Sequence, residues 1–183
     1  ANTLAAITAL SANVASVSGE RIHKELERAL TEGDAARAFS LLMTTGILEV
    51  VLPECIGRDH EKTLHAVTEL NTPSLPAVVS LAVGPMSYSN AETLGQRLKM
   101  SNDEKKRLNY FSESRAGFET IGAQDGAPAI RFIRHPLWPD AADLVRAELK
   151  AENASTEAVD ALLALQKRLT TDEMNPPRLM TGK

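Results

Sequence analysis

Apolar residues recur at three- and four-residue intervals along most of this chain, which is the spacing of one face of an α-helix. The first run, at Leu4, Ile7 and Leu10, predicts a short amphipathic helix that continues into residues 11–16. A second helix is predicted after Ser18, whose side-chain oxygen is suited to cap the free amides of a helix start. The apolar stripe expected for this second helix consists of Ile22, Leu26, Ala29 and Leu30. The charged side chains left toward water or a partner are Glu20, Lys24, Glu27 and Arg28.

Turn residues divide the next part of the chain into further short helices. Gly33 ends the second helix, and Asp34 is a good N-cap for a third that ends at Gly46. The residues expected to pack in this third helix are Ala38, Leu41 and Leu42. Residues 47–52 are expected to form a short helix that stops before Pro53, because the α region is disfavoured before a proline. A connector follows at residues 53–59, and the next helix is predicted at residues 60–70.

The second half of the chain continues the helical pattern. Residues 75–83 are strongly apolar and predict a buried helix or, as the weaker alternative, a strand. Residues 91–99 are expected to be helical, and Ser101 with Glu104 forms a capping box that opens a helix to about Arg115. Glycines predict an irregular segment at residues 117–127, followed by helices at about residues 129–134, 139–151 and 156–169. The pattern predicts an all-α fold, a multi-helix bundle.

Composition agrees with this fold and limits the function. Aromatic residues make up only 4% of the 183 residues, whereas strands favour aromatic and β-branched side chains. The single cysteine, Cys55, cannot form an internal disulfide, and no apolar run of about 18 residues exists that would span a membrane. We therefore expect a cytoplasmic protein with no membrane partner. The net charge of −4 argues against a uniformly basic nucleic-acid binder and leaves only local basic patches.

Candidate catalytic and metal-binding groups are few. His60 and His65 are five residues apart, so on a helix they point about 140° away from each other instead of converging on one ion. Cys55 is not flanked by a histidine and an acid in the arrangement that activates a thiol nucleophile. No catalytic residue and no metal ligand is therefore predicted in this chain.

Two motifs resemble a known family of enzymes. The sequence SGERIHKEL at residues 18–26, with TGILE at residues 45–49 and LPE at residues 52–54, is similar to the neck of tRNA nucleotidyltransferases (CCA-adding enzymes) and bacterial poly(A) polymerases. That neck has the patterns S-x-E-R-I-x-x-E-L and G-[IL]-L…L-P-E. Weaker similarity continues through residues 91–108 and in PPRLMTGK at residues 176–183. The resemblance implies a helical neck at residues 1–56 and a helical body at residues 57–183.

The resemblance also implies that catalysis belongs to a head domain that precedes residue 1, so that the chain is a fragment. In this family the head carries a G-S loop and a D-x-D pair that use Mg²⁺ with ATP or CTP, and neither motif occurs here. We therefore expect a non-catalytic RNA-binding scaffold with no cofactor of its own, inactive alone. Its partners would be the head and the 3′ end of a tRNA or another RNA. The neck motif is common to CCA-adding and polyadenylating members, because the head selects the nucleotide.

Contacts to RNA or to the head are expected on the neck helix. The candidates are Glu20, Arg21, Lys24 and Arg28, and a salt bridge within the neck is an equal alternative for Arg21. Weaker candidates for RNA contact are Arg97, Lys99, Lys105, Lys106, Arg131 and Arg134.

Two alternative functions remain open. The body of many relatives resembles an HD phosphohydrolase domain, in which an apolar helix ends in an adjacent His-Asp metal-binding pair. Here the apolar residues 76–83 end in Gly84 and Pro85, so this chain would be a degenerate HD domain. The second alternative is a helical protein-interaction module without an RNA role.

Overall fold

The structure of the chain is a computed structural model that describes residues 3–121 and 127–169. Within these residues it contains eleven α-helices, two short 3-10 helices and no strands, which confirms the predicted all-α fold. The elements are α1 (Thr3–Leu10), η1 (Ser11–Ser16), α2 (Gly19–Thr31), α3 (Ala35–Thr44), α4 (Ile47–Val51), η2 (Pro53–Cys55), α5 (His60–Glu69), α6 (Leu75–Val83), α7 (Tyr88–Arg97), α8 (Asn102–Ile121), α9 (Ala127–Ile133), α10 (Trp138–Ala151) and α11 (Glu157–Arg168). The PPRLMTGK motif at residues 176–183 lies outside the described residues.

Two predicted helix starts show the expected capping hydrogen bonds, whereas Ser18, at the N-cap of α2, makes no side-chain capping hydrogen bond and corrects that expectation. Asp34 accepts a hydrogen bond from the backbone N–H of Arg37 at 2.9 Å, as expected for the N-cap of α3. The predicted capping box is confirmed, since the backbone N–H of Ser101 donates to Glu104 Oε2 at 2.7 Å and the N–H of Glu104 donates to Ser101 Oγ at 3.2 Å. Gly46 adopts a left-handed conformation (φ 73°) at the end of α3, where only glycine enters without strain.

The apolar residues Leu75–Val83 form the helix α6, and the strand alternative is wrong. All nine of its residues are buried. α6 packs against α2, α5, α8 and α10, so every side of it meets protein. A helix that is apolar all round is stable only in such a central position.

The segment predicted as irregular is partly helical, which corrects the expectation for residues 117–121 and for Ala127. α8 continues past Arg115 to Ile121, and α9 begins at Ala127. Gly117 does not break α8, because α9 packs against it: a Cβ on this glycine would lie 2.8 Å from Phe132 Cε2. The close approach of a ring explains a glycine inside a helix, which otherwise costs about 1 kcal/mol relative to alanine. Residues 122–126 lie outside the described residues.

Two of the residues expected to pack in α2 and α3 are exposed, which corrects the prediction. Leu41 of α3 is 47% exposed and Ala29 of α2 is exposed, whereas Phe39, which the spacing did not single out, is fully buried. No residue of α1 is buried, and Leu4 and Ile7 are each about 40% exposed. The side of a helix that faces the core is set by its neighbours, and three-residue spacing alone does not identify it.

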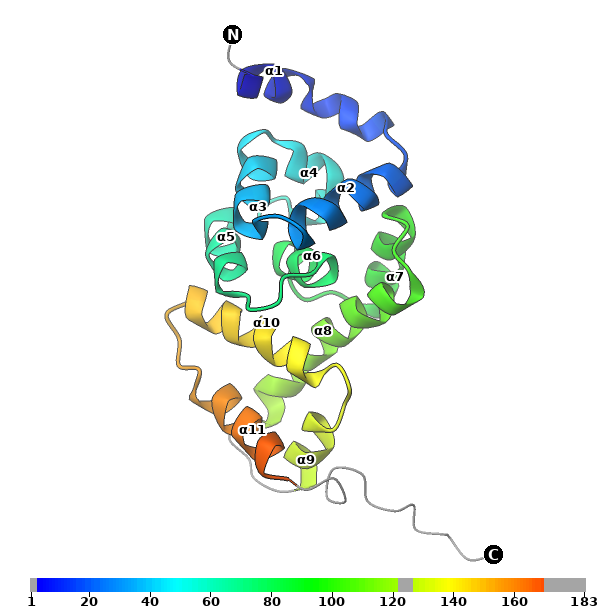
Figure 1. Cartoon of the computed structure of the whole chain (residues 1–183). Coiled ribbons are helices and arrows are strands. Elements are labelled where there is room, and N and C mark those ends of the chain that lie inside the picture. Colours follow the sequence, from blue (N-terminus) through cyan, green and yellow to red (C-terminus); the bar gives the residue numbers. More distant parts are fainter. Residues whose placement is uncertain (1–2, 122–126, 170–183) are drawn as a thin grey trace, which may run out of the picture.

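One hydrophobic core extends from α2 to α11. Leu26, Leu30 and Phe39 from the first helices belong to the same buried cluster as Val67 of α5 and Leu144 of α10. Figure 1 shows α1 at one end of the molecule, α9 and α11 at the other, and α6 in the interior between them. Trp138, the only tryptophan, is fully buried against Phe132, with ring centroids 4.8 Å apart, so its role is one of packing. No helix in the described part of the chain is long and apolar enough to cross a membrane.

Candidate nucleic-acid interface

The candidate residues on α2 form a basic stripe, which we define as Arg21, Lys24 and Arg28. All three side chains are exposed. At 100° per residue their spacing places them within an arc of about 60° on the helix, roughly opposite the buried Leu26 and Leu30. The burial of the apolar side therefore turns the basic stripe toward solvent, along about 10 Å of helix.

Acidic side chains lie beside the basic stripe and leave its side chains exposed. Glu20 lies 3.9 Å from Lys99 Nζ, and Arg28 Nε lies 3.5 Å from Glu32, both as exposed pairs. The backbone N–H of Glu20 lowers the pKa of its carboxyl below the ordinary value; desolvation opposes this, and Ser18 and the charge of Lys99 lower the pKa further. Exposed pairs of this kind are screened by water and contribute little to stability. They leave the cations available to an external anion.

Arg97, at the end of α7, joins the first 56 residues to the rest of the molecule. Its guanidinium donates to the Val51 carbonyl at 2.5 Å and to both carboxylate oxygens of Glu54 at 2.6 and 2.7 Å. Its own backbone carbonyl faces Gly19, where a Cβ would approach to 2.4 Å. Because these donors are engaged within the chain, Arg97 has a structural role that competes with the predicted contact to RNA.

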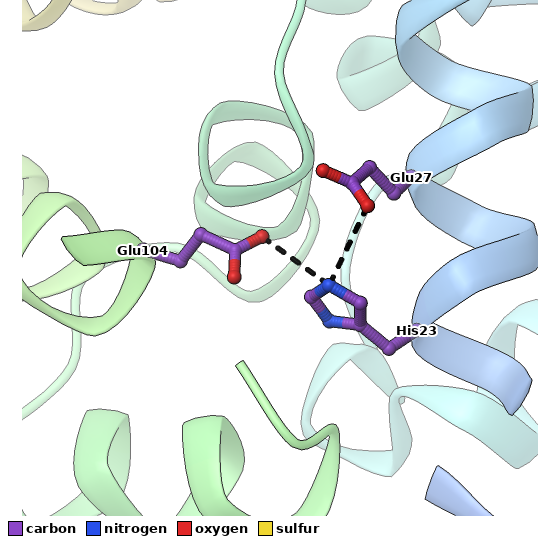
Figure 2. A group of neighbouring side chains, drawn as sticks. All are labelled: His23, Glu27 and Glu104. Carbon is purple, nitrogen blue, oxygen red and sulfur yellow. Dashed lines mark ion pairs between the residues drawn. The ribbon is translucent and has the colours of Figure 1, made fainter. Parts of the chain in front are cut away.

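A second junction is the His23 cluster, which consists of His23, Glu27 and Glu104. Figure 2 shows His23 and Glu27 on α2 pointing toward Glu104 on α8. His23 Nε2 lies 3.7 Å from Glu27 Oε2 and 3.5 Å from Glu104 Oε1. The sequence alone did not reveal this group. The i, i+4 spacing of His23 and Glu27 could have indicated that these two side chains are neighbours on a helix, whereas nothing in the sequence places Glu104 beside them.

The weaker basic candidates are dispersed over the body. Lys105 Nζ pairs with Glu92 at 3.4 Å, and Lys106 Nζ pairs with Asp103 at 3.5 Å. Both lysines line a cavity of about 560 Å³ together with His135, whose ring stacks on Tyr110 with centroids 3.8 Å apart. The remaining candidates, Arg131 and Arg134, are exposed at α9 and just after it. The tertiary structure thus brings His135 beside two lysines that are consecutive in the sequence.

The two histidines considered for metal binding do not form a pair. His60 Nε2 lies 3.4 Å from Glu49 Oε1, and its side chain is 18% exposed. His65 is exposed, and neither histidine belongs to a group of potential metal ligands within the described residues.

The helix α6, at whose end an HD phosphohydrolase would carry its His-Asp pair, is followed by Gly84 and Pro85 and contacts an ion pair at its middle. On α6, Ser80 accepts a hydrogen bond from the buried Arg115 at 2.7 Å, and Arg115 also forms an ion pair with Glu148 of α10 at 2.6 Å. These groups satisfy one another and provide no histidine. The described residues therefore offer no ligand set of the HD kind at α6.

The relation to known proteins lies in the first helices. Residues 1–56 match the family model described as "Probable RNA and SrmB- binding site of polymerase A". No curated protein matches the chain. The matched residues include the basic stripe and both groups that Arg97 contacts, Val51 and Glu54. The match supports a poly(A) polymerase-like family and an RNA-binding region, and it does not address CCA addition.

Proposed function

We propose that this chain is the RNA-binding scaffold of a nucleotidyltransferase of the poly(A) polymerase kind, and that the basic stripe on α2 contacts RNA phosphates. The observation that carries the proposal is the match of residues 1–56 to an RNA-binding site of polymerase A. In this proposal a separate catalytic head, using Mg²⁺ and ATP, extends the RNA 3′ end that the helices hold. Cytoplasmic localisation and a role in tRNA processing remain predictions from the sequence.

The distribution of charge supports the stripe as the contact. Residues 1–56 contain four lysines and arginines, Arg21, Lys24, Arg28 and Arg37, and three of these four form the stripe. Lysine and arginine bind RNA chiefly by neutralising phosphates and releasing their counterions. Because the stripe is short and acidic groups flank it, we expect weak binding that depends on salt, with further contacts from the rest of the enzyme.

The test is the affinity for a labelled single-stranded RNA, measured by fluorescence anisotropy at several salt concentrations. Replacing Lys24 and Arg28 together by alanine is expected to weaken binding and to reduce the slope of log K against log salt by about 1.4, since each lost phosphate contact on a single strand contributes about 0.7. The matched control is the double alanine variant of Lys167 and Arg168, exposed on α11 at the opposite end of the molecule (Figure 1).

Three outcomes are informative. The proposal is supported if the α2 variant binds RNA more weakly and with a smaller salt slope while the control variant binds as the parent does. Equal losses in both variants would indicate nonspecific attraction, and the absence of salt-dependent RNA binding by the parent chain would contradict the proposed function. Added ATP or CTP with Mg²⁺ is expected to give no RNA extension by this chain, because it lacks the D-x-D pair.

A further inference from the structure

We propose that His23, Glu27 and Glu104 bind a divalent transition-metal ion of the zinc class, which joins α2 to α8. An imidazole nitrogen and two carboxylate oxygens come together here, and all three ligand atoms lie within 4.8 Å of one another (Figure 2). Nitrogen ligands favour zinc, cobalt and nickel over magnesium and calcium, which prefer oxygen alone. The proposal is independent of RNA binding.

The distances within the His23 cluster are close to those of a tetrahedral site. Two ligands that are each about 2.0–2.1 Å from a tetrahedral ion are about 3.3 Å apart. His23 Nε2 lies 3.5 Å from Glu104 Oε1 and 3.7 Å from Glu27 Oε2. Movements of a few tenths of an ångström bring each carboxylate to this distance from His23, and the two carboxylate oxygens, which lie within 4.8 Å of each other, must move closer together around the ion.

The charge of the cluster also favours a cation. Two carboxylates face one imidazole, and within the described residues neither carboxylate has a lysine or arginine nitrogen within 4 Å. With a neutral His23 the cluster carries a charge of −2, which a divalent ion neutralises. The electrostatic attraction between such an ion and a carboxylate is strongest where the carboxylate is partly buried. The Glu104 side chain is only 17% exposed.

The surroundings orient one ligand well and another poorly. The second oxygen of Glu104 accepts the Ser101 N–H of the capping box, so the first oxygen is held toward His23. His23 Nδ1 is buried and has no hydrogen-bond partner among the described residues. Loss of such an outer partner typically weakens metal binding about 10- to 100-fold. We therefore expect micromolar affinity, with water completing the coordination on the side of Glu27, which is 55% exposed.

Occupancy of the site would have a defined structural consequence. α2 carries the basic stripe, and Glu104 lies in the first turn of α8, in the body. A metal bound between them stabilises the docking of α2 on the body, because it binds the folded arrangement alone.

The test is calorimetric titration of the tag-free protein with zinc, together with the visible absorption of bound cobalt(II), which reports tetrahedral coordination. His23→Ala and Glu104→Gln are expected to weaken binding by roughly tenfold or more, since each removes a ligand. Glu104→Gln retains an oxygen that accepts the Ser101 N–H, and the exposed Glu27→Gln serves if either variant fails to fold. Matched controls are His65→Ala and Glu61→Gln, an exposed histidine and glutamate four residues apart on α5.

One stoichiometric site that is lost in the cluster variants and kept in the controls supports the proposal. Absence of binding up to millimolar zinc, or equal losses in cluster and control variants, would overturn it.

Discussion

Cys55 shows how strongly the fold changes the properties of a single side chain. Cys55 is the last residue of η2, and its side chain is fully buried in the core. Burial, and next the nearby charge of Glu49, raise the pKa of the Cys55 thiol to about 11. Both causes disfavour the thiolate, the form that reacts. The sequence interpretation of Cys55 as a non-catalytic residue agrees with this environment.

The native protein is therefore expected to react very slowly with a thiol reagent such as DTNB. At pH 8 a thiol with a pKa near 11 is ionised in about one molecule in a thousand, compared with roughly a quarter for an ordinary cysteine. The rate should rise with pH up to about 11, because the thiolate fraction rises until the pKa is reached. A rate at pH 8 equal to that in denaturant would show that Cys55 is accessible in the native state.

At the scale of elements, α2 owes its position to a glycine. A Cβ on Gly19 would lie 2.4 Å from the backbone carbonyl of Arg97, so α2 and the end of α7 meet without a side chain between them. The family pattern leaves this position open, and the sequence alone suggested no reason for glycine. The reason is the close contact between two segments far apart in the chain.

Gly19→Ala is expected to destabilise the protein by about 1–3 kcal/mol, because backbone atoms must move to admit the methyl group. Helix propensity alone would favour alanine by about 1 kcal/mol, so the sign of the change separates the two effects. The measurement is the urea unfolding midpoint. The control is Gly33→Ala, just after the end of α2, where a Cβ would approach only Ala29, with its carbonyl oxygen 3.0 Å away. A Gly19→Ala protein as stable as the parent would contradict the contact.

The elements differ in how well the sequence predicted them. α5, α6 and α10 were identified from apolar spacing and from turn residues, and the capping box at Ser101 identified the start of α8. The end of α8 was missed, because Gly117 in sequence resembles a breaker and becomes a packing position only when Phe132 lies against it. Helix starts depend on neighbours in sequence, whereas this helix end depends on a contact with α9.

At the scale of the whole molecule, the first 56 residues and the following helices share one core. The domain boundary at residue 56 stays a prediction, and the buried cluster contains residues from both sides of it. A shared core makes separate unfolding of either part costly, because each would expose apolar surface to water.

We therefore expect a single cooperative unfolding transition in urea. Each part has a natural probe. The fluorescence of Trp138, the only tryptophan, reports on the body, and the reactivity of Cys55, the only cysteine, reports on the first 56 residues. The two curves should coincide within error. Exposure of Cys55 at a clearly lower urea concentration than the change at Trp138 would show that the first helices detach by themselves.

The sequence by itself determined the helical class, most helix starts and the motif that pointed to an RNA-binding neck, because these depend on residues within a few positions of one another. The family resemblance also drew attention to Glu20, Arg21, Lys24 and Arg28 as contact candidates on this helix, which stay predictions. Only the tertiary structure decided that Arg97 ties α7 to Val51 and Glu54, and that Glu104 faces His23. Such pairs join residues that are distant in the chain, and their meeting follows from how the apolar faces of all the helices pack into one core.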